Sequence, residues 1–323
     1  MRALAYARSI AALIGVVITV LCASVACAQN YPNKPVRIIA SEVGGPGDFT
    51  SRIVAQGLTG ALGEPVIVEN RPTANIALEI VAKAEPDGYT LVTNNNPMWY
   101  TPFMRKTSYD PVKDFLPITL MTSAPAVLVV HPSLSAKSVA EMIALAKAKP
   151  GTLNFATGSA GSSARLAGEL LKAKAGVNIV LVPYKGTGPA ITSLLSGQEV
   201  QLMFSPPTGA APQIKAGRLR ALAVTSAKTS ALFPELPTMA ATLPGFELVS
   251  VVGMFAPART PAALITRLNR EIVRVLTQPD VKSKFFEVGV EVIGSSPEQF
   301  AAAIKSDMAV MGKVITDAGI RAE

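Results

Sequence analysis

Short apolar segments alternate with amphipathic segments along almost the whole chain, and this alternation limits the fold more than any other feature. Val36–Ala40, Val66–Val68 and Tyr89–Thr93 are short, apolar and rich in β-branched residues, as buried strands are. Between the first two, apolar residues recur every three or four positions from Phe49 to Leu62, which is typical of a helix. Strands that alternate with helices predict βαβ units and parallel sheets.

The length of the chain favours two lobes over the alternative of one large doubly wound domain. About 295 residues remain after residue 28, enough for two ordinary α/β domains. Val127–Val130 and Phe246–Phe255 are apolar extended segments without a crossover helix close behind them, and we interpret them as paired hinge strands. This predicts one lobe from residues 29–128 and 253–323, and a second lobe from residues 129–252.

The first 28 residues have the pattern of a secretory signal peptide. A short basic start with Arg2 and Arg8 precedes an apolar stretch. Ala26-Cys27-Ala28 then has small residues at the two positions that signal peptidase recognises. We predict cleavage after Ala28 and a periplasmic protein. Both cysteines, Cys22 and Cys27, would be removed, so the mature chain would have no disulfide. Lipidation of Cys27 is the competing interpretation, although the leucine usual at such sites is missing.

Composition argues against membrane spans and nucleic-acid binding. The longest apolar stretch after residue 28, Leu248–Ala258, is interrupted by Ser250, Gly253 and Pro257 and is shorter than the roughly 18 residues that a span needs. Loss of Arg2 and Arg8 lowers Lys+Arg from 30 to 28 against 22 acids, for a net charge of about +6. These basic residues are scattered, so the charge favours anionic ligands in general and not nucleic acid.

Signatures of catalysis, cofactors and metals are missing from the sequence. His131 is the one histidine, and it precedes a proline at a predicted strand end, where a structural role is more common than a catalytic one. A periplasmic enzyme that uses Asp48, Lys185 or His131 is the less favoured alternative. Trp99 and Tyr100 follow an asparagine-rich loop, and they either wall a pocket or pack beneath the loop.

Five predicted strand-to-helix loops are rich in Gly, Ser, Thr and Asn. In parallel sheets such loops meet at the carboxyl ends of the strands, where ligands bind. Each also offers backbone N–H groups at the positive end of a helix, which suits a carboxylate. Asp48 stands where a helix N-cap is expected. The loops are Ser41–Asp48, Thr93–Pro97 with Asn95, Thr157–Ser163, Tyr184–Pro189, and Ser205–Thr208.

Several longer motifs resemble the substrate-binding proteins of tripartite tricarboxylate transporters, the Bug family of periplasmic receptors, over essentially the whole mature chain. The motifs are Tyr31–Ile38, Gly44-Gly45-x-x-Asp48-x-x-x-Arg52, Val68–Pro72, Pro86–Leu91, Tyr109–Phe115, Val182–Gly186 and Leu219–Thr225. The resemblance implies a two-lobed type II periplasmic binding fold in which each lobe is an α/β sheet flanked by helices. It also implies a receptor that closes on a small organic acid and needs no cofactor.

The resemblance extends to individual ligand-binding positions and to partners. It assigns ligand loops to Gly44, Gly45 and Asp48, to Thr157, Gly158, Ser162 and Ser163, and to Tyr184 and Lys185. We add Asn95 and Ser205 from the loop pattern. We expect the protein to be a monomer. Its expected partner is a tripartite tricarboxylate-type membrane transporter, or alternatively a sensor protein.

Two departures from the family pattern bear on the ligand. Glu42 stands in the first ligand loop, where it would repel a carboxylate or pair with an amine. Ser205 stands where the family often has an aspartate, so a partner for an amine is lost.

Overall fold

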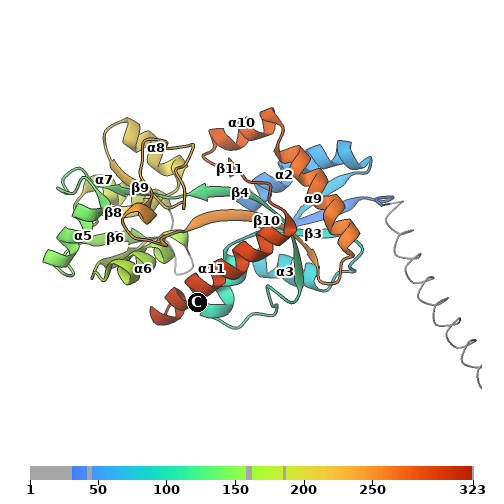
Figure 1. Ribbon diagram of the computed structural model, residues 1–323, viewed down its shortest axis with the longest axis horizontal. Coiled ribbons are helices and arrows are strands. Elements are labelled where there is room, and N and C mark those ends of the chain that lie inside the picture. Colours follow the sequence, from blue (N-terminus) through green and yellow to red (C-terminus); the bar gives the residue numbers. More distant parts are fainter. Residues whose placement is uncertain (1–30, 42–45, 158–161, 185–186, 322–323) are drawn as a thin grey trace, which may run out of the picture.

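The computed structural model describes residues 31–41, 46–157, 162–184 and 187–321, which form two lobes that each contain a sheet flanked by helices (Figure 1). This confirms the predicted fold class. The predicted signal peptide, and the predicted site residues Gly44, Gly45, Gly158 and Lys185 together with Glu42, lie outside the described residues. Within the described part, no helix has the length and apolar character needed to cross a membrane.

Lobe 1 is built on a six-stranded sheet with the order β11-β4-β10-β3-β1-β2. Strands β1, β2 and β3 are parallel, and β10 runs antiparallel to both β3 and β4. The strands are β1 (Val36–Ala40), β2 (Val66–Asn70), β3 (Thr90–Asn95), β4 (Phe115–Pro125), β10 (Val249–Pro257) and β11 (Glu291–Val292). The helices are α2 (Pro46–Leu62), α3 (Ala74–Ala82), α4 (Pro97–Met104), α9 (Ala262–Leu276), α10 (Pro279–Glu287) and α11 (Pro297–Asp317).

Lobe 2 is built on a five-stranded sheet with the order β7-β6-β8-β5-β9. The strands are β5 (Val127–Val130), β6 (Asn154–Thr157), β7 (Val180–Pro183), β8 (Leu202–Ser205) and β9 (Arg220–Val224). The helices are α5 (Val139–Ala148), α6 (Ser163–Ala175), α7 (Thr187–Ser196) and α8 (Pro207–Lys215), and the 3-10 turn η1 (Met239–Ala241) follows β9. The sheet is parallel from β7 to β8, whereas β5 is antiparallel to both of its neighbours.

The predicted pairing of the hinge strands is wrong. β5 does not pair with β10; it lies between β8 and β9, and all four of its residues are buried. The partner of β10 is β4, an eleven-residue strand that the sequence did not reveal. The predicted parallel pairing is found among β1, β2 and β3 and among β6, β7 and β8. β10 and β5 are antiparallel to their neighbours, because they enter their sheets through connections between the lobes and not through βαβ crossovers.

The sequence Ser296-Pro297-Glu298-Gln299 has the pattern of a capping box, and α11 begins there. The side chain of Ser296 accepts a hydrogen bond from the Gln299 N–H, and the Gln299 side-chain oxygen accepts one from the Ser296 N–H, as a capping box requires. Asp48, however, is not an N-cap: α2 already begins at Pro46, which leaves Asp48 in the first turn. Proline has a fixed φ that suits the first helical position, and the helix starts at Pro46, three residues before Phe49, the first helical residue that an N-cap at Asp48 predicts.

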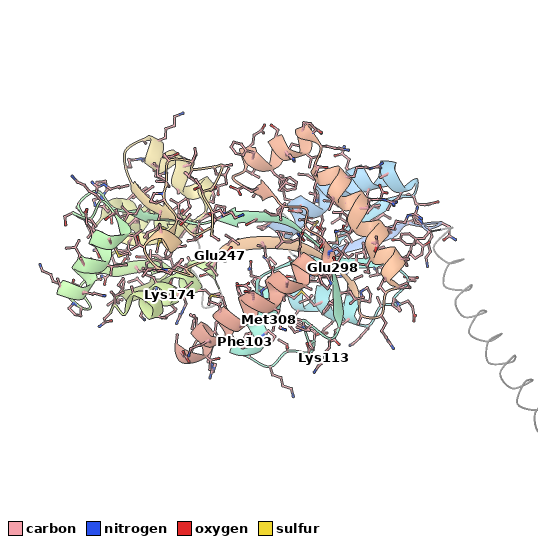
Figure 2. All side chains as sticks on the ribbon, viewed as in Figure 1. Phe103, Lys113, Lys174, Glu247, Glu298 and Met308 are labelled. Atoms are coloured by element: carbon pink, nitrogen blue, oxygen red, sulfur yellow. The ribbon has the colours of Figure 1, made fainter. Side chains whose placement is uncertain are left out.

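The core is continuous across the lobes on one side and divided on the other. One cluster of buried apolar residues runs from Trp99 and Phe255 in lobe 1 to Phe155 and Phe204 in lobe 2. Figure 2 shows Phe103 of α4 and Met308 of α11, which both pack against this cluster. On the other side, each lobe has its own separate cluster. This division leaves room for a cavity between the lobes.

Helix α11 supports the continuous side. It packs against β4 and α4 of lobe 1 and also contacts α6 of lobe 2. Its Phe300 lies so close to β10 that a Cβ atom at Gly253 would come within 2.1 Å of the ring. A larger residue at position 253 would therefore push the helix away from the sheet.

Candidate functional site

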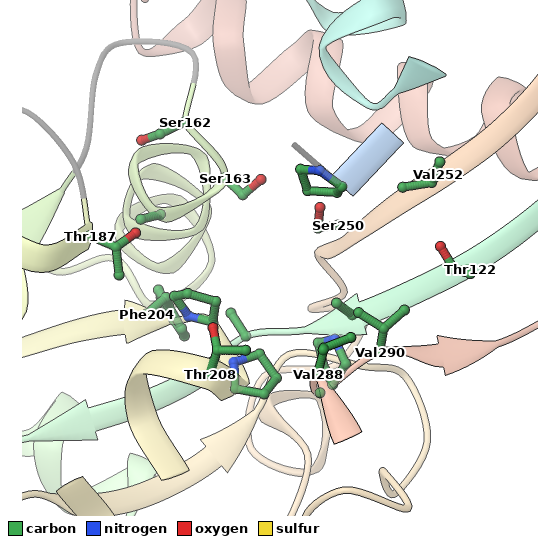
Figure 3. Close-up of a pocket in the computed structure, with 18 of the residues that line it drawn as sticks. Thr122, Ser162, Ser163, Thr187, Phe204, Thr208, Ser250, Val252, Val288 and Val290 are labelled. Atoms are coloured by element: carbon green, nitrogen blue, oxygen red, sulfur yellow. The ribbon is translucent and has the colours of Figure 1, made fainter. Parts of the chain in front are cut away.

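A cavity of about 740 Å³ lies between the two lobes (Figure 3). Lobe 1 contributes residues from α2, from the paired strands β4 and β10, and from the segment Val288–Val290. Lobe 2 contributes the first residues of α6, α7 and α8 together with Met203 and Phe204 of β8. The volume falls within the range of small-molecule sites, about 300–1,000 Å³.

The two strands that lead from one lobe to the other form part of the cavity wall. Thr122 of β4 is the register partner of Val252 of β10, and Ala124 is the partner of Ser250; all four residues line the cavity. The chain leaves the first sheet at Pro125 and enters the second at Val127. The connection between the two sheets therefore lies beside the cavity.

Four helices begin at the cavity. Pro46 of α2, Ser163 of α6, Thr187 of α7 and Pro207 of α8 are all first residues of their helices, and all line the wall. The first-turn N–H groups of a helix have no partner within the helix, and they carry partial positive charge. Pro206, the N-cap of α8, makes no side-chain capping bond. Four such ends at one cavity form an environment suited to an anion.

The described wall offers hydroxyl groups and apolar surface but no ionisable side chain. Its polar side chains all come from serine and threonine: Thr50, Thr122, Ser162, Ser163, Thr187, Thr208 and Ser250. The other described residues are glycine, alanine, proline and larger apolar residues. An anion bound here would therefore be held by hydroxyl and backbone N–H donors of the described wall.

One side of the cavity is closed by direct contact between the lobes. Gly289 lies between α10 and β11 of lobe 1 and packs against Pro207 of lobe 2, where an added Cβ would lie 2.6 Å from the Pro207 Cβ. Its φ of +73° also favours glycine. Two residues further on, the Glu291 carboxylate accepts hydrogen bonds from the Ser230 hydroxyl at 2.6 Å and from the Ala231 N–H at 3.1 Å.

Of the described residues predicted to bind ligand, Ser162 and Ser163 line the cavity. Ser162 is the N-cap of α6, and its hydroxyl accepts a hydrogen bond from the Arg165 N–H at 3.3 Å. Figure 3 shows these two serines on the same side of the cavity as Thr187 of α7.

Three other predicted residues lie at strand or helix ends near the cavity but not in its described wall. Asp48 is buried, and its carboxylate pairs with Arg52 at 3.0 Å and accepts a bond from the Asn70 amide at 2.9 Å. Asn95 ends β3 as the register partner of Val252. Thr157 ends β6 fully buried, and its carbonyl accepts a bond from the Tyr184 N–H.

The last two described predictions, Tyr184 and Ser205, are also outside the described wall. The Tyr184 hydroxyl donates to Ser193 at 2.7 Å or Glu199 at 2.6 Å. Burial, and then the Glu199 carboxylate, raises the pKa of Tyr184. Ser205 is buried between the lining residues Phe204 and Pro206, and its hydroxyl donates to the Pro206 carbonyl at 3.1 Å. All these assignments stay predictions.

The open question about Trp99 and Tyr100 is settled in favour of packing. Both are buried in α4, and both donate to the Asp307 carboxylate of α11, at 2.8 Å from the Trp99 Nε1 and 2.5 Å from the Tyr100 hydroxyl. Burial, together with the Asp307 charge, raises the pKa of Tyr100. His131 hydrogen-bonds to Ser133 two residues later, and it does not line the cavity.

Sequence reasoning did not select several lining residues. Thr187 and Thr208 lie in loops that were singled out, but neither residue was chosen. Ser250 had a signal, because a serine inside an otherwise apolar strand needs a reason to be there. Thr122 had no comparable signal, because strand β4 was not recognised in the sequence. The segment Val288–Val290 had none either, because it is a short connection between α10 and β11.

A protein-family profile and several solved structures are similar to this chain over most of its length. The sequence profile described as "Tripartite tricarboxylate transporter family receptor" matches residues 50–320. A structure of R. palustris Rpa4515 with adipate is 34% identical, covers 90% of this chain and 99% of its own, and has a TM-score of 0.71. The periplasmic binding protein BugD is 31% identical, with coverage of 91% and 100% and a TM-score of 0.68.

A third structure, MatC from Rhodopseudomonas palustris with bound malate, is 28% identical. The match covers 88% of this chain and 100% of MatC, with a TM-score of 0.67.

Proposed function

The chain belongs to the family of tripartite tricarboxylate transporter receptors, and we propose that it captures a small organic acid between its lobes and delivers it to a membrane transporter of the tripartite tricarboxylate type. The observation that carries the proposal is the meeting of four helix N-termini at one interlobe cavity. Related proteins hold adipate and malate, which are both carboxylates.

The carboxylate would be held mainly by helix N-termini. First-turn N–H groups and the hydroxyls of Ser162, Ser163 and Thr187 supply donors without a buried cation. The remaining sequence-derived positions are part of the proposed ligand environment: Gly44, Gly45, Asp48, Asn95, Thr157, Gly158, Tyr184, Lys185 and Ser205. Waters would bridge the donors that do not reach the ligand directly.

Capture would proceed by movement of one lobe against the other. We propose lobes of residues 29–128 with 253–323, and of residues 129–252, whose boundaries fall within β5 and β10. The continuous core beneath α11 would act as the fixed side, and the contact between Gly289 and Pro207 would form or strengthen on closure. Hinge closure around a ligand is an established way for two-lobed receptors to trap it.

Related binding proteins work in the periplasm, and the N-terminal pattern supports the same location for this chain. We propose export and cleavage after Ala28, with a receptor and not a catalytic role for the mature protein. The mass of the protein recovered from a periplasmic extract tests the cleavage site: it should match a chain that starts at Gln29.

Calorimetry on protein that has been unfolded and refolded to strip any bound ligand tests the function. A panel of mono-, di- and tricarboxylates, with amines and sugars as controls, should give one-to-one binding by at least one acid. At a thousand times its Kd, that acid should stabilise the fold by about 4 kcal/mol. Binding of sugars or amines without any acid would contradict the proposal.

A further inference from the structure

In the described wall of the cavity, hydroxyl groups gather near the starts of α6 and α7, and valines gather on the opposite side. Figure 3 shows Ser162, Ser163 and Thr187 together near the starts of α6 and α7. On the opposite side it shows Val252, Val288 and Val290, with Thr122 beside them. A carboxylate at the helix ends would therefore point the rest of its molecule toward valine side chains.

Both lobes contribute to the apolar wall. Met203 and Phe204 come from β8, Leu248 and Val252 come from the β9–β10 connection and β10, and Phe49 comes from α2. Met203, Phe204 and Val252 are almost fully buried, so their apolar surface is held in place by the packing of each lobe. This buried part of the wall therefore exists before a ligand arrives, whereas Phe49 and Val288 are exposed.

An ammonium group has no anionic partner among the described residues of this wall. No described lining residue is acidic. The nearest acid along α2, Asp48, is already paired with Arg52 at 3.0 Å and with the Asn70 amide at 2.9 Å. A charge buried without a counter-charge is strongly unfavourable, so an amino acid would bind poorly.

A hydroxyl group on the body of the ligand would also be unmatched. Beside Val252 and Val290 it would lose its water and meet mostly methyl groups, with the Thr122 hydroxyl as the polar group nearby. Apolar pockets discriminate against an added hydroxyl by about tenfold to a hundredfold.

We propose that the acid bound here has a hydrocarbon body, aliphatic or aromatic, that carries neither an ammonium group nor a hydroxyl group facing β10 and the segment Val288–Val290. This rests on the proposed function, because it assumes that a carboxylate occupies the helix ends. It narrows the ligand to acids without an ammonium or hydroxyl group on the part of the body that faces this wall.

Matched acids test the proposal by calorimetry on the purified protein. Adipate is compared with β-hydroxyadipate and α-aminoadipate, and phenylpropanoate is compared with para-hydroxyphenylpropanoate and phenylalanine. In the series that binds, the unsubstituted acid should bind at least tenfold more tightly than its hydroxylated form, and the ammonium form should not bind measurably.

A pair of substitutions locates the effect. Val290→Thr keeps the size of the side chain and adds a hydroxyl to the apolar wall, so the preference for the unsubstituted acid should shrink severalfold. Val310→Thr makes the same change at an exposed position of α11 outside the cavity and should leave the preference unchanged. Thr122→Val provides the opposite change and should strengthen the preference.

The outcomes separate this inference from the function beneath it. If an acid binds but its hydroxylated or ammonium form binds more tightly, the inference is overturned. The proposed receptor function then still stands. A preference that Val290→Thr and Thr122→Val both fail to alter would also overturn it. If no acid binds at all, the proposed function and this inference fail together.

Discussion

The Glu291 carboxylate accepts a 2.6 Å hydrogen bond from the Ser230 hydroxyl, and this bond joins the sheet edge of lobe 1 to the loop after β9. Glu291 is anchored on its own side because β11 pairs with β4. Ser230 is almost fully buried, and the neighbouring Ala231 N–H donates to the same oxygen. The contact therefore stabilises the arrangement in which the lobes enclose the cavity.

Removal of this carboxylate should favour more open arrangements. Glu291→Ala loses two hydrogen bonds, each worth about 0.5–1.5 kcal/mol, so the enclosed population should fall several- to a hundredfold. Small-angle X-ray scattering of the ligand-free protein should give a larger radius of gyration, and the bound acid should dissociate faster.

The control for Glu291→Ala is Glu287→Ala, which removes an exposed carboxylate from α10 whose partner, Ser283, is in the same helix. It should change neither measurement. In a double-mutant cycle, Ser230→Ala should add less to Glu291→Ala than it costs alone, because the shared bond is already gone. Additive effects would show that the two residues do not act through this bond.

A larger residue at the contact between the lobes should also favour more open arrangements. Gly289→Ala places a Cβ only 2.6 Å from the Pro207 Cβ, well inside van der Waals contact, so the lobes would have to separate to accommodate it. Gly294→Ala is the matched control, because Gly294 also has a positive φ of +64° but has only ordinary contacts at 3.5 Å and beyond.

Both glycine variants should lose stability to backbone strain by a similar amount, about 1 kcal/mol. Gly289→Ala alone should weaken ligand affinity and enlarge the ligand-free protein in scattering. Equal effects of the two variants on affinity would mean that strain, and not contact between the lobes, is responsible.

The sequence predicted the local elements well because their signals are local. β1 to β3 and the helices between them follow from apolar spacing and from turn residues such as Gly63, which has a φ of +77°. The pairing of β10 with β4 did not follow. β4 contains Pro117 and ends with Pro125, which obscure the strand pattern, and its partner lies more than a hundred residues away.

The candidate site divides in the same way. Ser162 and Ser163, which line the cavity, were selected because a helix start after a strand is visible in the sequence. Ser250 and Thr122 were missed because their place in the wall depends on which strands pair across the sheet. Val288 and Val290 reach the cavity only because β11 returns to the edge of β4, which no short pattern encodes.

The two adjacent serines at the start of α6 should separate binding from stability. Ser163→Ala removes a cavity hydroxyl and leaves the cap intact, so acid affinity should fall about tenfold or more with little change in melting temperature. Ser162→Ala also removes the N-cap bond to the Arg165 N–H, which should cost about 1 kcal/mol of stability. Calorimetry and thermal denaturation of both variants measure the difference. An unchanged affinity in Ser163→Ala would remove that hydroxyl from the site.

Glu69 should make stability depend on acidic pH. Hydrogen bonds from Arg37, followed by those from Arg71, lower the pKa of Glu69 to about 2, against a usual value of 4.5. The Arg37 Nε donates to one carboxylate oxygen at 2.5 Å, and Arg71 donates to the other at 2.7 Å. Because the folded pKa is the lower one, the stabilisation is fully present above about pH 4.5 and is lost as the pH falls toward 2.

Glu69→Gln should therefore lower the free energy of unfolding at pH 7 by about 1.5–3 kcal/mol, the range for hydrogen bonds to a charged group. The deficit relative to the unmodified protein should shrink steadily between about pH 4.5 and pH 2. Urea denaturation at a series of pH values measures it. Glu85→Gln removes the same charge from an exposed residue and should show no such convergence. If the Glu69→Gln deficit stays constant down to pH 2, the arginine contacts do not hold the carboxylate in its charged form.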